Sequence, residues 1–291
     1  MPQGFDPLPV EIAMQAAVAQ VDAQMSTWRP DSDLMHLNRG LPGQWIAVQD
    51  HLMTVLSCAA EVGRASDGAF DINVGDAVDA WGFGSGEASA SAIRDALHGH
   101  RRPAHDLLEL DRATGQVRKH GAMALDLSGI AKGYGVDRLT QIAMAFDIPG
   151  ALLAIDGDLR AVGLRPDGSA WTVAIEQPCY DLRAPHSCLD LHDAAAATSG
   201  DYRHWVEVDG RRLSHTIDPT RGGPLASSPA SVTVIAENCM VADAWATALM
   251  VRGSLDGAVL ARRHNLDALF LERRGDRFHQ ASSGRLFADA C

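Results

Sequence analysis

One stretch of the sequence, residues 121–138, limits the possible folds more than any other. Residues 123–127 form a mostly apolar run that predicts a β-strand, and two small residues follow, Ser128 and Gly129. Apolar residues then recur at helical spacing, which predicts a helix over residues 133–146. The start of a helix presents unpaired N–H groups and the positive end of the helix dipole. This strand, turn and helix start is therefore predicted to be able to hold an anion.

Two residues of opposite charge, Asp126 and Lys132, flank this turn. A carboxylate beside a lysine can form an ion pair that only stabilises the turn. The same two side chains can instead contact a bound ligand. The stretch by itself leaves both interpretations open, so other segments have to decide between them.

The composition indicates a globular protein and argues against nucleic-acid binding. Of the 291 residues, 46% are hydrophobic and 21% are charged, which is enough apolar material for a sizeable core. The net charge is −12, from 25 basic and 37 acidic residues, whereas a nucleic-acid backbone requires clustered Lys and Arg. The basic residues form only short pairs, which we interpret as solvated surface: Arg101–Arg102, Arg211–Arg212, Arg262–Arg263 and Arg273–Arg274. No nucleic-acid partner is expected.

The cysteines and the hydropathy argue against several further classes. The five cysteines are odd in number, scattered and never in a Cys-x-x-Cys pair, so neither a zinc site nor a disulfide framework is predicted. No run of about 18 apolar residues is present, so no membrane-spanning helix is predicted. Residues 1–10 lack the basic region and apolar core of a signal peptide, so we expect a soluble chain without an export signal.

The order of predicted elements indicates an α+β fold. Helices are expected over residues 11–25, 33–38, 52–63, 89–99, 133–146, 240–251 and 255–264. Strands are expected in a hairpin over 106–127 and over 151–155, 171–175, 189–198, 203–217, 231–236 and 268–271, with a loop over 178–188. Hairpins mixed with helices fit an α+β fold better than a strictly alternating parallel sheet. No repeat or low-complexity linker divides the chain, so one domain over residues 1–291 is expected.

One predicted helix carries a carboxylate and a hydroxyl on the same face. Asp243 and Thr247 are four residues apart, which places them one helical turn from each other. Two hard oxygen ligands of this kind suit Mg²⁺, which takes few protein ligands. The alternative is an exposed aspartate beside a threonine that bonds to its own helix.

Other candidate residues lie at strand ends and turns. His215 ends a predicted strand before a turn rich in Pro and Gly, where it could act as a general base or serve the structure alone. Thr198 and Ser199 begin a segment whose hydroxyls suit a phosphate or a ribose, although a simple turn is the alternative. An aromatic residue beside an acid at 70–71 and a tryptophan at 28 could contact a ring or simply pack.

Familiar nucleotide and hydrolase motifs are absent. The sequence contains no Gly-x-x-x-x-Gly-Lys-Ser/Thr, no His-Glu-x-x-His and no Gly-x-Ser-x-Gly. The glycines at 82–86 do not follow a predicted strand with dinucleotide-binding spacing. A P-loop, a zincin site, a hydrolase nucleophile elbow and a Rossmann turn are therefore not predicted.

Taken together, these segments resemble one family, the ApbE-type FAD:protein FMN transferases. The matching segments occur in family order over roughly residues 25–250, and it is their combination that makes the resemblance specific. They are Met25–Asp33 with Asn38, Gly68–Asp71 with Trp81–Gly84, Asp126–Tyr134, Gly157–Asp158, Thr198–Tyr202, Ser214–His215 with Asp218–Pro219, and Ala242–Ala244 with Thr247.

The resemblance implies a fold and a set of ligand contacts. The family is an α+β, T-fold-like unit of two related lobes that binds FAD between them. Mg²⁺ would be held by Asp243, Thr247 and the backbone carbonyl of Gly129. The implied FAD contacts, together with the two hydroxyl residues found above, are Trp28, Ala69, Phe70, Asp71, Asp126, Lys132, Thr198, Ser199 and Ile217.

The resemblance also implies a reaction. Members move FMN from FAD to a threonine hydroxyl of a target protein and release AMP, and their targets are flavin-carrying subunits of membrane redox complexes. Lys132 would supply a positive charge, and we expect His215 to receive the threonine proton while Asp218 orients it. Hydrolysis of FAD to FMN and AMP and FAD binding without turnover are the alternatives. A periplasmic or inner-membrane location follows from the resemblance alone.

Three departures from the family pattern are expected to matter. The family's N-terminal strand with a Met-Gly-Thr segment is not found, so a truncated start or a more open site is expected. Trp28 stands where a tyrosine is common. Asn73 and Asp76 replace the usual Thr and Pro, which adds an acid near an anionic ligand.

Overall fold

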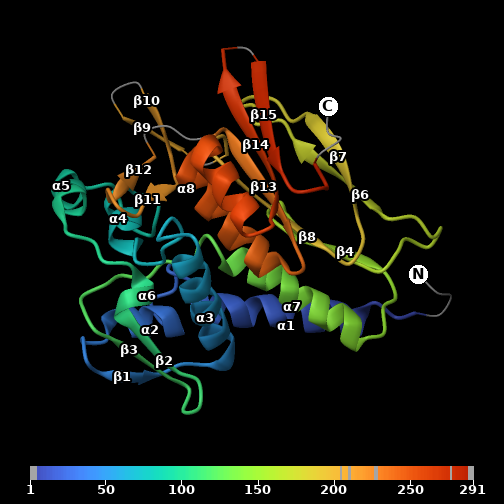
Figure 1. Ribbon diagram of the computed structural model, residues 1–291. Helices are drawn as coiled ribbons and strands as arrows, with labels where there is room; N and C mark the ends of the chain where they lie inside the picture. The colour runs from blue at the N-terminus through green and yellow to red at the C-terminus, as the bar shows by residue number, and fades with distance from the viewer. Residues whose placement is uncertain (1–4, 204, 209–210, 226–228, 276, 288–291) are drawn as a thin grey trace.

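The fold is organised around one antiparallel sheet, seen at the upper right of Figure 1. The computed structural model describes residues 5–203, 205–208, 211–225, 229–275 and 277–287. Its largest sheet has six strands in the order β15-β14-β13-β8-β5-β4, and each pairs antiparallel with its neighbours. The strands are β4 (Ala151–Ile155), β5 (Asp158–Val162), β8 (Ala195–Gly200), β13 (Ser231–Ala236), β14 (Asp267–Arg274) and β15 (Arg277–Ser283).

Two long helices cover one face of this sheet. Helix α8 (Cys239–Arg263) packs against β8 and β13, and α7 (Ala131–Ala145) packs against α8, β4 and β5. Alternate residues of β13 point at α8, so Val232 and Val234 are fully buried in the main core. Burying each such side chain contributes roughly 1.5–3 kcal/mol. Helix α1 (Leu8–Met25) packs on α7, and α3 (Asp50–Ala65) packs on α8.

The opposite face of the sheet is covered by a hairpin rather than by helices. Strands β6 (Trp171–Glu176) and β7 (Pro185–Leu191) pair with each other and lie over this face. Ile175 and Leu189 from the hairpin join a second buried cluster with Ala196, Ile235 and Leu271 of the sheet. The sheet is thus buried on both faces, by helices on one side and by a hairpin on the other.

The remaining elements form the lower left of Figure 1 and an upper rim. A three-stranded sheet has the order β1-β3-β2, with two further two-stranded pairs, β9–β10 and β11–β12. The strands are β1 (Trp45–Ala47), β2 (Leu108–Asp111), β3 (Gln116–Lys119), β9 (Trp205–Val208), β10 (Arg211–Ser214), β11 (Ile217–Asp218) and β12 (Gly223–Pro224). The short helices are α2 (Asp33–Arg39), α4 (Gly75–Ala80), α5 (Ala90–His98) and α6 (Ala104–Leu107).

The strand predicted over residues 123–127 is wrong, and a side chain explains why. The backbone there is not part of any sheet among the described residues. Leu125 donates its N–H to the Asn38 side chain at 2.8 Å and accepts from the same amide at 2.9 Å. The N–H of Asp126 donates to the Ile72 carbonyl at 2.8 Å. One asparagine therefore replaces the neighbouring strand that the apolar pattern led us to expect.

Other boundaries also differ from the prediction for local reasons. The predicted loop 178–188 is wrong at its end, because β7 begins at Pro185. The predicted strand 189–198 is interrupted at Asp193, whose φ of 46° lies in the left-handed region. The two predicted helices 240–251 and 255–264 are correct, because Gly253 breaks the helical geometry inside α8 with φ 76° and ψ 172°.

The interpretation of Arg101 as solvated surface is wrong. Its side chain is only 9% exposed and forms a bidentate ion pair with Asp76 at 2.9 and 2.6 Å. The acid expected to add negative charge near the ligand is thus neutralised. Arg273, also interpreted as solvated, forms a bidentate pair with Asp201 at 3.0 Å for both bonds.

The α+β prediction is confirmed by this mixture of helices and antiparallel strands. The predicted relation between two lobes and the single-domain boundary stay predictions. None of the helices in the described part of the chain is long and apolar enough to span a bilayer.

Candidate active site

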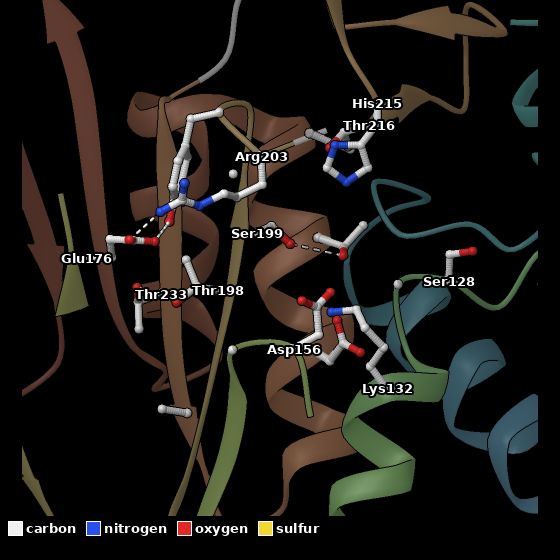
Figure 2. A pocket seen from close by; sticks show the side chains of 18 of the residues that line it. Ser128, Lys132, Asp156, Glu176, Thr198, Ser199, Arg203, His215, Thr216 and Thr233 are labelled. Atoms are coloured by element: carbon white, nitrogen blue, oxygen red, sulfur yellow. Dashed lines mark hydrogen bonds and ion pairs between the residues drawn. The ribbon is translucent and has the colours of Figure 1, made fainter. Parts of the chain in front are cut away.

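A cavity of about 970 Å³ lies where β8, the start of α7 and the middle of α8 meet (Figure 2). Every predicted site residue except Trp28 and Asp218 lines it. These residues are Ala69, Phe70, Asp71, Asp126, Gly129, Lys132, Thr198, Ser199, His215, Ile217, Asp243 and Thr247. The fold therefore brings together segments that are separated by more than half of the chain.

Asp243 is held at the contact between α7 and α8. It is almost fully buried, and its Oδ2 accepts a hydrogen bond from the Gly133 N–H at 3.0 Å. A Cβ at Gly133 would lie only 2.3 Å from the Cys239 carbonyl oxygen, so only glycine permits this close helix crossing. Burial raises the pKa of Asp243, and the nearby Asp158 carboxylate raises it further.

Gly129 meets Thr247 beside this carboxylate. A Cβ at Gly129 would lie 2.9 Å from the Thr247 Oγ1, which shows how closely the turn before α7 approaches α8. The same hydroxyl lies 3.2 Å from the Oγ of Ser199. The helix and the last part of β8 thus place two hydroxyl oxygens next to each other, close to the turn before α7.

The donor set at this point fits Mg²⁺. Asp243, Thr247 and the Gly129 carbonyl are all hard oxygen donors, and Mg²⁺ is commonly bound by one or two carboxylates together with substrate phosphates and water. Within the described ranges, no three His, Cys, Asp or Glu side chains gather as a metal site. The arrangement therefore differs from a zinc centre or a cage of protein carboxylates.

Lys132 pairs with an aspartate that was not the expected one. Its Nζ lies 2.6 Å from Asp158 Oδ2, whereas Asp126 was the partner considered from the sequence. Burial by itself would lower the pKa of Lys132, but Asp243 and Asp158 outweigh it and raise the pKa. Lys132 is therefore charged at the wall of the cavity, held by a carboxylate whose side chain is 2% exposed.

Two acids, Asp126, which is buried, and Asp71, which is half-buried, hold backbone turns at the cavity wall. The Asp126 carboxylate accepts from the Ser128 N–H at 2.8 Å, and burial raises the pKa of Asp126. The Asp71 carboxylate accepts from the N–H groups of Asn73 and Ala104 at 2.9 and 3.0 Å. Burial likewise raises the pKa of Asp71. Both acids fix the shape of the wall as well as lining it.

His215 follows directly after β10 and lines the cavity near Thr216, as Figure 2 shows. Its ring lies edge-on to Phe83, with ring centroids 6.4 Å apart. Asp218 accepts from the Thr220 N–H and hydroxyl at 2.9 and 2.7 Å, which caps the turn after β11. Its predicted role in orienting His215 stays a prediction.

Trp28 lies outside the main cavity and is 65% exposed. It belongs to the loop between α1 and α2, and its neighbour Thr27 lines a small second cavity of about 100 Å³ together with Asp126. Stacking of Trp28 on a flavin ring stays a prediction.

The sequence did not single out several residues that line the cavity. They come from the β6–β7 hairpin, from the turn after β4 and from the chain after β8: Asp156, Glu176, Arg183, Tyr202 and Arg203. Tyr202 is the last residue of the family-matching segment Thr198–Tyr202. Nothing in the spacing of the hairpin residues indicated a site. Glu176 and Arg183 reach the cavity only because the hairpin packs over the sheet.

The fold and the cavity define a protein with a group of oxygen donors and a lysine beside a space large enough for a dinucleotide. The chain belongs to the ApbE family, because the model of that family matches residues 4–270. The family predicted from the sequence motifs is thereby confirmed.

Named relatives and solved structures agree with this assignment. The chain is 36% identical over 265 residues to an FAD:protein FMN transferase from Vibrio cholerae, covering 91% of this chain and 79% of the relative. It is 32% identical over 263 residues to an FAD:protein FMN transferase from Escherichia coli K12, covering 88% and 75%. The apo crystal structure of the flavinyl transferase ApbE from Pseudomonas stutzeri superposes with a TM-score of 0.84 at 34% identity, covering 97% and 88%.

Proposed function

We propose that this protein transfers the FMN moiety of FAD to a threonine hydroxyl of an acceptor protein and releases AMP, with Mg²⁺ as cofactor. The names of its relatives support FAD as the flavin donor and a protein as the acceptor. One observation in the structure adds support that the names of the relatives do not provide. Gly129, Asp243 and Thr247 come from distant parts of the chain and meet at one wall of the cavity.

The reaction replaces the phosphoanhydride bond of FAD by a phosphoester bond to threonine. The threonine oxygen forms a bond to the phosphorus of the FMN half, the bond from that phosphorus to the bridging oxygen breaks, and AMP leaves. Positioning and charge neutralisation supply most of the rate enhancement in such transfers. When bound, Mg²⁺ would neutralise the diphosphate and the leaving group.

Lys132 contributes a fixed positive charge to this step. Its ammonium group is anchored by Asp158, so it does not have to be ordered when the diphosphate arrives. The three donors of the ammonium leave N–H groups for a phosphate oxygen in addition to the Asp158 bond. The ion pair thus supports binding instead of serving only the turn.

His215 is the group in our proposal that takes the threonine proton. It follows a strand end and lines the cavity, so an acceptor threonine that enters the cavity can reach the imidazole. Its contact with Phe83 restricts the ring. Asp218 sits three residues further along the chain and would orient the imidazole.

The acceptor and its compartment follow from the family resemblance. A flavin-carrying subunit of a membrane redox complex is the acceptor we propose, which would place the reaction at the periplasmic side of the inner membrane. Direct attack on a folded domain requires the cavity to be open to a protein loop. The exposed side of the cavity near Arg183, whose side chain is 80% exposed, provides such an opening.

The proposal is tested by incubating the protein with FAD and Mg²⁺, with and without an acceptor domain that contains a threonine. Covalent flavin on the acceptor, seen by in-gel fluorescence and intact mass, together with an equal amount of AMP, supports transfer. Formation of AMP at the same rate without acceptor would support hydrolysis instead. Bound but intact FAD in both reactions would indicate a binding protein.

A further inference from the structure

A cluster at the hairpin side of the cavity has no role in the proposed transfer step. Glu176, the last residue of β6, accepts a hydrogen bond from the Tyr202 hydroxyl at 3.2 Å and binds the Arg203 guanidinium. All three residues line the cavity. Figure 2 shows the Arg203 guanidinium beside Glu176, with Ser199 between this cluster and Lys132.

A strand irregularity lies opposite Glu176. The pairing register of β6 and β7 shifts between Ile175 and Glu176, so that Glu176 lies opposite Pro185 and the extra residue, His186, belongs to β7. Alternation along β6 places Glu176 on the same face as Ala174, which also lines the cavity. Bulges of this kind occur next to functional sites.

Tyr202 is fixed as firmly as the glutamate. It is 7% exposed, and a Cβ at Gly200 would lie 2.5 Å from its ring, so only glycine leaves room for the ring there. Burial and the charge of Glu176 raise the pKa of Tyr202 to about 12, so the hydroxyl stays protonated and donates. Arg203 lies over the same ring, 4.9 Å from its centroid.

Arg203 is held from two sides and retains donors for a ligand. A guanidinium has five N–H groups in a planar fork, and Glu176 occupies one edge of it. A second arginine, Arg183, approaches Glu176 only to 3.7 Å and is 80% exposed. Two cationic side chains thus surround one carboxylate, which leaves this end of the cavity positive in a chain of net charge −12.

We propose that Arg203 binds a phosphate group of FAD, with Glu176 and Tyr202 as positioning residues that hold the guanidinium in place. The inference rests on the proposed function, because it names a further contact of the same substrate. Lys132 and Arg203 come from different elements and line one cavity. A diphosphate carries two negative charges, and these two cations lie on either side of Ser199 to receive them.

The proposal is tested by measuring the binding of FAD, AMP and riboflavin by calorimetry to variants of the full chain. For Arg203→Ala and Arg203→Lys the affinity for FAD and for AMP is expected to fall about 10- to 100-fold, because a charge-assisted bidentate contact is lost. Riboflavin, which lacks phosphate, should bind as in the wild type. Glu176→Gln should lower the FAD affinity about 3- to 10-fold, and Tyr202→Phe less.

A matched pair outside the cavity controls for general effects of charge. Arg274 pairs with Glu272 at 2.7 Å on β14, away from the cavity. Arg274→Lys and Glu272→Gln should leave all three affinities unchanged. Thermal unfolding of each variant separates loss of binding from loss of folding, and Arg203→Lys keeps the test valid if the alanine variant unfolds.

Three results would overturn the inference. The first is an unchanged affinity for FAD and AMP in both Arg203 variants. The second is a loss of riboflavin affinity in these variants as large as their loss of FAD affinity. The third is an Arg203 variant in which only the KM for the acceptor rises. A Glu176→Gln variant that binds FAD like the wild type would remove the positioning role. Failure of the wild type to label an acceptor would sink the proposed function, whereas the FAD and AMP affinities would still decide the role of Arg203.

Discussion

The two walls of the cavity are built in different ways. The helix wall, formed by Gly129, Gly133, Asp243 and Thr247, depends on close approaches at two glycines that leave no room for a Cβ. The hairpin wall, formed by Glu176, Tyr202 and Arg203, depends on side-chain hydrogen bonds and an ion pair. Close packing at the glycines leaves the helix wall little freedom to shift, whereas the hairpin wall is positioned by side-chain contacts. We therefore expect substitutions in the helix wall to have larger effects.

The largest effect is expected for His215, which belongs to neither wall. His215→Ala should lower the rate of FMN transfer by about 100- to 10,000-fold, the usual range for loss of a general base. FAD affinity should stay within about twofold, because the imidazole acts on the acceptor proton. The measurement is single-turnover labelling of an acceptor domain. Turnover like that of the wild type would remove His215 from the mechanism.

The helix wall is tested next by Asp243→Asn. The amide can still accept the Gly133 hydrogen bond but has lost the charge that attracts Mg²⁺, so transfer should fall by about 100-fold or more. Titration of the transfer rate with Mg²⁺ checks this, and addition of a chelator to the wild type should reproduce the loss. An unchanged Mg²⁺ dependence in the variant would contradict the assignment of Asp243.

A single methyl group tests how closely the helices must approach. Gly133→Ala places a Cβ 2.3 Å from the Cys239 carbonyl oxygen and should destabilise the protein by about 2–3 kcal/mol. Thermal and urea unfolding measure the change. Gly135→Ala is the matched control on the same helix, because its Cβ would meet only the end of the Ile155 side chain at 2.9 Å. Equal stability changes in the two variants would mean that the helix crossing tolerates a methyl group.

The smallest effect is expected at the exposed edge of the hairpin wall. Arg183→Ala should change the KM for FAD by less than about twofold, because an exposed pair at 3.7 Å is screened by solvent. Steady-state kinetics at two salt concentrations check this. A loss as large as that of Arg203→Ala would show that both arginines, and not one positioned residue, hold the ligand.

The motif residues were predictable because their chemistry is visible in short segments. The four-residue spacing of Asp243 and Thr247 places them on one helix face wherever the helix packs. A small residue between a strand-like run and a helix marked Gly129 as part of a turn before the helix, and the family resemblance added its predicted metal contact. The family, the mixed fold class and most helices followed from such local patterns. The roles of the individual site residues remain predictions.

Residues whose environment depends on distant contacts were misread. Arg101 looked like solvated surface, but it is buried against Asp76, which is 25 residues away. Residues 123–127 looked like a strand, but the Asn38 side chain, 87 positions from Leu125, takes the hydrogen bonds of a neighbouring strand. Neither partner is implied by periodicity, because periodicity reports only which face of an element is apolar.

The sequence by itself determined the family, through its motif segments, and the α+β class, and it supplied the residues of the predicted site. Only the tertiary structure decided which residues share the cavity, that Lys132 pairs with Asp158, and that the β6–β7 hairpin brings Glu176 to Arg203. The physical reason is that spacing along a helix or strand sets the direction of each side chain locally. Contacts between elements depend on how the sheet, helices and hairpin pack, which no single segment encodes.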